Sequence, residues 1–267
     1  MGFGSYSDLS GCLTVAILTL NEEGNLTRCL GAIPPGIRSV VVDSGSTDKT
    51  REIAEAHGAR VYLNLWPGFA AQRNFTLAHC DIDTDWVLFI DADETFEEPF
   101  WRWAVEMLPK DPGFDAVFID SRLLLDGVVL NYCPGYPLYH VRLVRRMPDV
   151  FVQGNAGHNE TVREGLRTEW LDIPYTHHWH SGPLRPWMEK HLRLAEMELT
   201  AQTVAQGVIT KRARLNRRLA PGPVRVIARF IYHYILRSGF KDGRAGFKFA
   251  SMYAWYEMTK WLLRIGR

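Results

Sequence analysis

The sequence has few cysteines and no long apolar run. Its four cysteines, Cys12, Cys29, Cys80 and Cys133, are spaced neither as a disulfide framework nor as a metal site. We therefore expect reduced thiols in a cytosolic compartment. No stretch of about 18 apolar residues occurs, which argues against a transmembrane helix. The first 13 residues have neither a basic start nor a long apolar stretch, so we expect no signal peptide.

Acidic residues are scarce in the last part of the chain. Residues 207–267 contain 14 Lys and Arg but two acids, whereas residues 1–206 contain 17 Lys and Arg and 28 Asp and Glu. The formal net charge of +1 therefore conceals two parts of opposite charge. We predict a domain over residues 12–206 and a basic, aromatic-rich helical extension over 207–267. Such a segment suits an anionic partner, either nucleic acid or lipid headgroups.

Apolar runs and helical periodicity alternate through the first half of the chain. The pattern predicts strands at residues 14–20, 39–43, 59–63 and 86–90, and helices at 22–32, 48–57 and 69–78. Alternating strands and helices predict an α/β fold with a parallel sheet flanked by helices. From Pro112 onward, an Asp126-Gly127 hairpin turn and a strand at 139–146 predict a mixed or antiparallel continuation. Further helices are predicted at 184–206, 224–237 and 244–263.

Polar residues follow three of the predicted strands. These clusters are Asn21-Glu22, Asp43-Ser44-Gly45-Ser46 and Asp91-Ala92-Asp93-Glu94. Ligands of such sheets bind outside the carboxyl ends of the strands, so we expect one site at this edge. Each cluster alone could be an ordinary strand-turn-helix with a capped helix. Together they predict a site in which a glycine and a helix N-terminus favour an anionic ligand.

Three acids, Asp91, Asp93 and Glu94, directly follow the apolar run 86–90. Carboxylates this close repel one another unless something positive lies among them. Two carboxylates one residue apart suit Mg²⁺ or Mn²⁺ and leave coordination positions for phosphate oxygens. Such an ion neutralises a diphosphate leaving group. The alternative interpretation is a strand that ends in a solvated acidic turn. Arg73 suits pairing with a phosphate or a carboxylate, although alone it would be read as a surface residue.

Four segments together resemble glycosyltransferase family 2, the inverting nucleotide-sugar transferases of the GT-A fold. They are TVAILTLNEEGNL, VVVDSGSTDKTREIAEAHGARVY, GFAAQRNF and DWVLFIDADE. A fifth segment, GFKDGRAGF, resembles the bacterial lipopolysaccharide-core glucosyltransferases. The resemblance implies a GT-A mixed sheet, a UDP-sugar donor, the ribose near Asp91 and a metal ion on Asp93. The other implied donor-binding residues are Leu20, Asn21, Glu22, Asp43, Ser44, Gly45 and Arg73.

Inversion by a single displacement requires a carboxylate that takes the proton of the acceptor hydroxyl. Glu160, in the segment GNAGHNETV, is our candidate, because similar enzymes carry the base in a His-Glu or Glu-Asp element at this point. Here an asparagine separates the histidine from the glutamate. Asp120 and Glu94 are alternative bases, and a solvated loop acid is the alternative interpretation of Glu160.

Three histidines, His177, His178 and His180, lie in the segment YTHHWHSG. Zinc is not favoured, because neither a cysteine nor an acid stands at a standard spacing. The resemblance implies that one histidine donates to the diphosphate. We name His178 and His180 as candidates, and the choice among the three stays open.

The helices predicted in the extension are amphipathic. Val224, Ile227, Ile231 and Ile235 fall near one face, and basic and aromatic residues surround them. This pattern is typical of a surface that lies in the headgroup layer. The alternative is a face that packs on the catalytic core or on a second copy of the chain, as a homo-oligomer. We expect no nucleic-acid partner, because no helix-turn-helix, zinc-finger or RNA-binding signature occurs.

We therefore predict an inverting, metal-dependent transferase that moves a hexose, by resemblance glucose, from a UDP-sugar. The expected acceptor is a lipid-linked or lipopolysaccharide-core oligosaccharide, at the cytoplasmic face of the inner membrane. One alternative is a family member that glycosylates a protein or peptide. A second alternative is a relative that binds nucleotide or lipid without catalysis.

Overall fold

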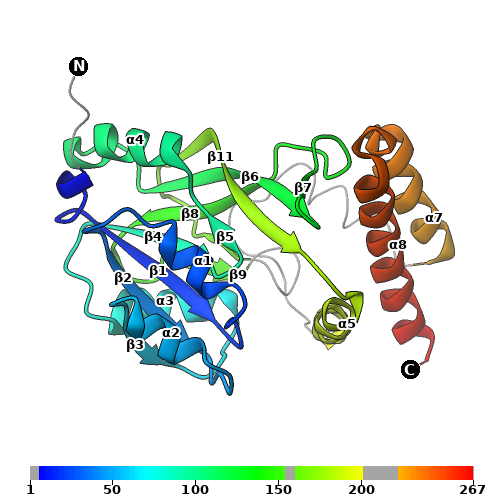
Figure 1. Cartoon of the computed structure of the whole chain (residues 1–267), viewed down its shortest axis with the longest axis horizontal. Helices are drawn as coiled ribbons and strands as arrows, with labels where there is room; N and C mark the ends of the chain where they lie inside the picture. Colours follow the sequence, from blue (N-terminus) through cyan, green and yellow to red (C-terminus); the bar gives the residue numbers. More distant parts are fainter. Residues whose placement is uncertain (1–5, 154–159, 201–221, 267) are drawn as a thin grey trace. The chain divides into compact units, whose positions relative to one another are not determined.

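The computed structural model describes residues 6–153, 160–200 and 222–266, and it divides into two compact units (Figure 1). The described residues of Met1–Ser121, Tyr139–Val152 and Glu160–His177 form unit 1. Those of Arg122–Leu138 and His178–Arg267 belong to unit 2. The predicted domain boundary at residues 206 and 207 lies outside the described residues.

The four predicted strands of the first half are confirmed. They are β1 (Leu13–Thr19), β2 (Arg38–Asp43), β3 (Arg60–Leu63) and β4 (Trp86–Asp91). All four run parallel in the order β3-β2-β1-β4 (Figure 1). The buried residues of β1 and β4 form near-continuous apolar runs, as expected for strands covered on both faces.

The sheet continues with antiparallel strands, so the predicted mixed sheet is confirmed. Beyond β4 lie β8 (Tyr139–Arg145), β6 (Ala116–Leu125), β11 (Thr168–His180) and β5 (Glu94–Thr95). A short strand, β7 (Val128–Val129), pairs with the end of β6 across the predicted hairpin turn. At that turn Asp126 and Gly127 both have positive φ, 49° and 79°, as a type I′ turn requires. A separate two-stranded sheet joins β9 (Phe151–Gln153) and β10 (Glu160–Val162).

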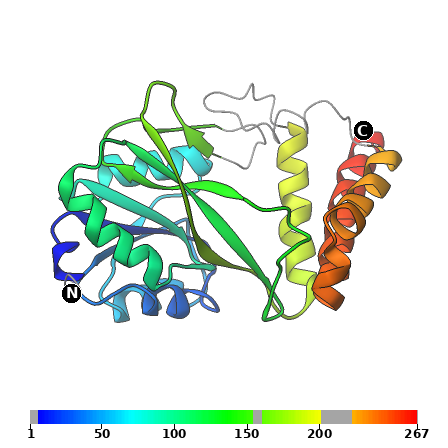
Figure 2. The same cartoon turned by 90° about the horizontal axis from the view of Figure 1, so that it is seen from above.

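Helices cover both faces of the sheet in unit 1 (Figure 2). Its α-helices are α1 (Leu26–Gly31), α2 (Thr50–Ala56), α3 (Phe69–His79) and α4 (Glu98–Met107), with 3₁₀ turns η1 (Tyr6–Asp8) and η2 (Leu108–Lys110). Alternate residues of β1 point to opposite faces. Val15 and Ile17 therefore pack with α1, α2 and α4, whereas Ala16 and Leu18 pack with α3. The first helix begins four residues later than predicted, because Asn21 has a positive φ of 56° and a turn follows it.

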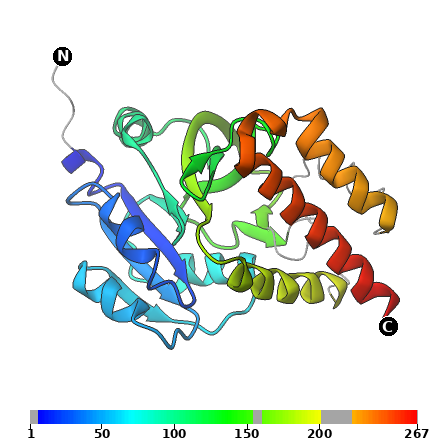
Figure 3. The ribbon, with the colours of Figure 1, turned by 45° about the vertical axis from the view of Figure 1, so that its right-hand side comes forward.

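Unit 2 contains α5 (Leu184–Thr200), α7 (Pro223–Ile231), the π-helical turn η3 (Tyr232–Leu236), η4 (Gly239–Asp242) and α8 (Gly243–Ile265). Helices α7 and α8 lie side by side (Figure 3). Their predicted positions are confirmed, and the described part of α5 agrees with the helix predicted from residue 184. The core of this unit includes Cys133, Trp187, Phe249 and Met252. None of the helices in the described parts of the chain is long and apolar enough to cross a membrane.

Two arginines of α7, Arg225 and Arg229, face α8. Both pair with the buried Glu257, at 2.8 and 3.1 Å, and Lys260 lies 3.5 Å from the same carboxylate. A buried carboxylate requires such partners, because an unpaired charge would cost several kcal/mol. These arginines therefore hold α7 to α8, and the predicted membrane-facing charge must come from other residues.

The segment GFKDGRAGF at residues 239–247 is explained by close packing in unit 2. An ideal Cβ at Gly246 would lie 1.9 Å from the carbonyl oxygen of Gly239. Asp242 accepts backbone hydrogen bonds from Asn131, Tyr132 and Cys133 at 2.9 to 3.0 Å. Only a glycine at residue 246 lets the start of α8 approach the η4 turn this closely.

We therefore expect Gly246→Ala to destabilise the protein by about 3 kcal/mol, because the added methyl group overlaps backbone that cannot move alone. Urea unfolding followed by circular dichroism measures the change. Gly31→Ala is the matched control, since no atom lies within 4 Å of the position that its new methyl group would take. An unchanged midpoint for Gly246→Ala would contradict the close approach.

Candidate active site

The three predicted polar clusters follow strands whose ends meet at one edge of the sheet. Thr19 of β1 stands opposite Asp43 of β2, and Leu18 stands opposite Asp91 of β4. The three strands are neighbours and parallel, so their carboxyl ends share this edge. The predicted convergence is therefore confirmed by the register.

The loops that follow β1 and β2 are bonded to each other. The backbone N–H of Asn21 donates to Ser46 Oγ at 2.8 Å, and Asn21 Oδ1 accepts from the backbone N–H of Thr47 at 2.9 Å. The backbone N–H of Glu22 donates to Thr50 Oγ1 at 2.8 Å. We call these two loops the paired loops. They hold two predicted donor-binding residues, Asn21 and Glu22, beside the start of α2, and Leu20 before them is exposed.

Asp43 is fully buried and shapes its own loop. Its carboxylate accepts hydrogen bonds from Thr19 Oγ1 at 3.0 Å and from the backbone N–H groups of Gly45 and Ser46 at 3.0 and 2.8 Å. Gly45 has a φ of 100°, which favours glycine. Asp43 thus fixes the backbone around Ser44 and Gly45, and contact of these three residues with a nucleotide stays a prediction.

Gln72 on α3 is a structural residue of the site that the sequence analysis missed. Its side chain is buried, and Nε2 donates to Ser44 Oγ at 3.2 Å and to the carbonyl of Asn64 at 3.0 Å. It therefore ties the ends of β2 and β3 to α3. Its position directly before Arg73 was the one feature of the sequence that could have indicated a role for Gln72 in the site.

Arg73 is buried between two carboxylates. Its Nη2 donates to Asp91 Oδ1 at 3.1 Å, and its Nε lies 2.9 Å from Glu160 Oε1. The guanidinium also lies over the Phe89 ring, 5.1 Å from its centroid. The structure therefore brings together three predicted residues, Arg73, Asp91 and Glu160, from α3, β4 and β10.

A second buried arginine, Arg142 of β8, completes the cluster and was not predicted. Its Nη2 donates to Asp91 Oδ2 at 2.8 Å and to Glu94 Oε1 at 2.6 Å, and its Nη1 lies 3.6 Å from Glu160 Oε1. A cation between Val141 and Leu143 in an apolar strand was the available signal, because buried arginines are almost always paired.

The positive partners of Asp91 and Glu94 are therefore guanidinium groups of the chain itself. Burial raises the pKa of Asp91, but Arg142 and Arg73 outweigh it and hold that pKa below the ordinary value. Burial raises the pKa of Glu94 above its ordinary value in spite of Arg142. Glu94 also accepts the backbone N–H of Asp91 at 3.1 Å, so it organises the strand end from inside the core.

Asp93 lies beside a histidine. The Nε2 atom of His177 is 3.4 Å from Asp93 Oδ2, and its Nδ1 atom is 4.0 Å from Glu94 Oε1. Burial lowers the pKa of His177, but the carboxylates of Asp93, Glu94 and Asp91 together outweigh it and raise that pKa above the ordinary value. His177, one of the three histidines left open by the sequence, lies beside the acids in unit 1.

The two named candidates differ from His177 in their surroundings. The ring of His180 lies in unit 2, where its Nε2 is 3.1 Å from the carbonyl oxygen of Gly182. His178 follows His177 on β11, so its side chain points to the opposite face of the strand. Their predicted contact with a diphosphate stays a prediction.

A divalent cation fits the donor chemistry of Asp93. The described residues contain no group of three His, Cys, Asp or Glu arranged to hold a metal ion. Mg²⁺ is commonly bound by one or two carboxylates together with substrate phosphates, rather than by a cage of protein ligands. Asp93, with an oxygen donor that is partly exposed, is compatible with that arrangement. Asp93 as the metal ligand stays a prediction.

The alternative base Asp120 is buried on β6. The preferred base, Glu160, begins β10. His158, which precedes it in the sequence, lies outside the described residues. Glu160 forms ion pairs with Arg73 and Arg142.

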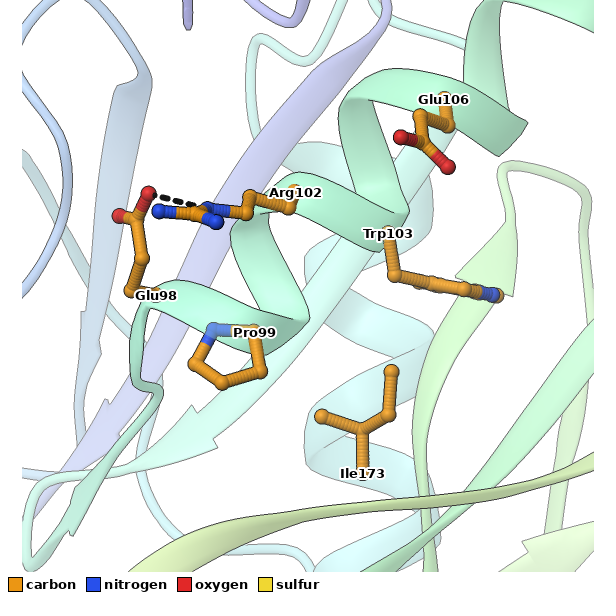
Figure 4. A pocket seen from close by; sticks show the side chains of 6 residues that line it. All are labelled: Glu98, Pro99, Arg102, Trp103, Glu106 and Ile173. Atoms are coloured by element: carbon orange, nitrogen blue, oxygen red, sulfur yellow. Dashed lines mark hydrogen bonds and ion pairs between the residues drawn. The ribbon is translucent and has the colours of Figure 1, made fainter. Parts of the chain in front are cut away.

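A hollow beside α4 and β11 contains none of these residues. In Figure 4 Glu98 and Arg102 form an ion pair at its edge, at 2.8 Å. The hollow is lined by Glu98, Pro99, Arg102, Trp103, Glu106 and Ile173. The charge cluster, rather than this hollow, is the candidate site.

Part of the chain is similar to known glycosyltransferases. Residues 14–124 match the model of the glycosyl transferase family 2. The lipopolysaccharide core biosynthesis glycosyltransferase LpsC of Rhizobium meliloti is 33% identical over 164 residues, which cover 57% of this chain and 58% of that protein. An uncharacterized glycosyltransferase of Rickettsia bellii is 40% identical over 83 residues, which cover 31% of this chain and 28% of that protein. The chain thus spans less than two thirds of the length of these relatives.

A solved structure with a related outline is glucosyl-3-phosphoglycerate synthase from Mycobacterium tuberculosis, in complex with Mn²⁺, UDP-glucose and glycerol 3-phosphate. It overlaps with a TM-score of 0.46 and 19% identity, over 76% of this chain and 86% of that chain. The family match and the mixed sheet flanked by helices confirm the predicted GT-A fold.

Proposed function

We propose, on the premise that residues 14–124 form a glycosyl transferase family 2 domain, that this chain is an inverting glycosyltransferase with a UDP-sugar donor. The observation that carries the proposal is the cluster at the carboxyl end of β4. Four acids and two buried arginines from five different elements meet there. Such a concentration of paired charge is costly to build and is typical of a functional site.

The cluster gives its acids different tasks. Arg73 and Arg142 hold Asp91 ionised at the strand end, where it suits hydrogen bonds from ribose hydroxyls. Asp93 has the His177 ring as a neighbour, with Nε2 3.4 Å from Oδ2. Asp93 would hold Mg²⁺ or Mn²⁺, which neutralises the charge that develops on a diphosphate as it leaves. The paired loops would hold the nucleotide, through Leu20, Asn21, Glu22, Asp43, Ser44 and Gly45.

Glu160 would accept the proton of the acceptor hydroxyl. Its carboxylate lies between Arg73 and Arg142, which fix its position at the edge of the same site. A fixed carboxylate within reach of the acceptor is what general-base catalysis requires. Asp120 and Glu94 remain the alternative bases.

Replacing this carboxylate tests the assignment. We expect Glu160→Gln to leave UDP-sugar binding within a factor of two to three, and to lower the transfer rate at least about a hundredfold, because an amide cannot take the proton. Calorimetric titration with UDP-sugar and single-turnover transfer measure the two effects. The exposed neighbour Glu164 is the matched control, as Glu164→Gln. A loss below tenfold would move the base elsewhere.

The activity itself is tested by UDP release. We expect the purified chain to release UDP from one UDP-hexose in a donor screen when an acceptor extract is present. Added Mn²⁺ should raise the rate and EDTA should abolish it, because the leaving diphosphate needs its charge neutralised. Nucleotide binding without release under any of these conditions would favour a non-catalytic relative.

The finer proposal is transfer of glucose to a lipid-linked or lipopolysaccharide-core oligosaccharide, at the cytoplasmic face of the inner membrane. The role of LpsC in lipopolysaccharide core biosynthesis supports this acceptor class. Residues 12–206 would be catalytic, and residues 207–267 would bind the membrane or acceptor. A transferase that modifies proteins is the alternative, in which the extension would be a homo-oligomer interface. Extracts fractionated into lipid and protein, used as acceptors, distinguish the two.

A further inference from the structure

The segment 239–247 has an outward side that its packing does not explain. Gly239, Asp242 and Gly246 face the interior of unit 2, as described above. In the same segment, Phe240 and Phe247 are 50% and 53% exposed. Lys241 and Arg244 are exposed as well. About half of each of these two large aromatic side chains is left exposed to water, so this side is a candidate binding surface.

These two rings belong to a larger group. The ring centroids of Phe247 lie 5.7 Å from Phe230 and 5.6 Å from Tyr234, and Phe240 lies 6.5 Å from Tyr234. Phe230 and Tyr234 come from α7 and η3 and are in contact at 5.4 Å. We call Phe230, Tyr234, Phe240 and Phe247 the aromatic patch.

Helix α7 extends the patch with aliphatic side chains. Ile227 and Ile231 are 62% and 43% exposed, and their spacing from Phe230 and Tyr234 is that of one helical face. The apolar face of α7 that the sequence predicts is therefore turned to solvent within unit 2, instead of packing on its core.

The charge around the patch is positive. Residues 222–266 contain eight Lys and Arg and two acids, Asp242 and Glu257. Both acids are engaged inside unit 2, Asp242 by backbone N–H groups and Glu257 by the arginines of α7. The nearby Asp126 is paired with Lys248. Lys241 and Arg244 thus have no acid of this segment to neutralise their field.

We infer that the aromatic patch, with Lys241 and Arg244, binds an anionic lipid surface. Apolar and aromatic side chains that insert at the level of the headgroups, flanked by basic residues, combine the two signals that reversible membrane binding requires. A second copy of the chain is a poorer occupant, because a two-fold contact would bring the same basic residues together. This inference rests on the proposed function in one respect: an enzyme with a lipid-linked acceptor would have a reason to bind a membrane.

Vesicle sedimentation of the full-length chain tests the inference. We expect binding to vesicles of phosphatidylglycerol and phosphatidylcholine, and none to phosphatidylcholine alone. Lys241→Gln with Arg244→Gln should lower the affinity roughly 25-fold, since each basic residue near an anionic surface contributes roughly fivefold. Phe240→Ser with Phe247→Ser should lower it at least about tenfold.

Matched controls remove equal charge and equal exposed apolar area from unit 1. They are Lys49→Gln with Lys110→Gln, and Leu63→Ser with Leu65→Ser, whose leucines are 61% and 73% exposed. Circular dichroism shows that each variant is folded. Equal losses in the controls, or no binding of the wild-type chain to anionic vesicles, would overturn the inference.

Two further readouts separate the other possibilities. Sedimentation equilibrium without vesicles compares the particle mass of the wild type with that of the Phe240→Ser, Phe247→Ser variant. A lower mass for the variant would show that the patch is an interface between copies, and the inference would be wrong. UDP release with a detergent-solubilised acceptor reports the proposed function by itself. Release without vesicle binding would overturn the membrane patch and leave the transferase standing.

Discussion

Asp93→Ala is expected to abolish metal-stimulated UDP release while the protein stays folded. The protein should stay folded because the Asp93 side chain is partly exposed and its neighbour is His177, 3.4 Å away. Removing Asp93 therefore does not take a cationic partner away from a buried acid. The loss should exceed about a thousandfold, because charge on the leaving diphosphate is among the largest contributions to such barriers. UDP release measured against Mn²⁺ concentration provides the test.

The control for this variant is Asp81→Ala, which removes a carboxylate that is 79% exposed. It should change neither the rate nor the Mn²⁺ dependence. Equilibrium binding of Mn²⁺ in the presence of UDP should disappear in Asp93→Ala. If the variant retains wild-type turnover at every Mn²⁺ concentration, the metal lies elsewhere or is absent from the reaction.

The second large effect is expected at Arg142. Arg142→Met removes the guanidinium that pairs with Asp91 and Glu94, and Glu94 is completely buried. Leaving a buried charge without its partner costs about 3–5 kcal/mol. The free energy of unfolding should fall by that amount, and transfer should be lost, because Asp91 and Glu160 both lose a partner.

Two companion variants separate stability from catalysis at this position. Arg142→Lys keeps one charge but cannot bond two carboxylates at once, so it should recover part of the stability and little of the activity. Arg142→Met combined with Glu94→Gln should recover stability, because the acid is then neutral. Arg38→Met, at a pair that is 53% and 66% exposed, is the control and should change stability by less than about 1 kcal/mol. A fully stable Arg142→Met would show that the pairing is dispensable.

Much of the fold follows from local pattern. The strands before Asp43 and Asp91 are predictable because apolar runs that end in turn residues leave few alternatives, and parallel pairing then brings their ends together. The hydrogen bonds between the paired loops were not predicted, because they depend on the pairing of β1 with β2. The sequence also does not show that the Asp43 carboxylate accepts hydrogen bonds from the backbone of its own loop.

The partners of the acids could not be predicted in the same way. Arg142 lies 51 residues after Asp91, on a strand that pairs antiparallel to β4. His177 reaches Asp93 only because β11 pairs with β5 at Thr176 and Thr95 and at His177 and Glu94. These contacts depend on strand order, which the pattern of apolar residues leaves undetermined.

The paired loops have a consequence for how a ligand would be received. Hydrogen bonds run in both directions between them, including Glu23 N–H to Asp48 and Lys49 N–H to Glu23 at 3.1 Å each. Neither loop can shift without carrying the other. A nucleotide would therefore bind to a preorganised surface. Its binding would cost little loop conformational entropy, because the two loops are already ordered in the folded protein.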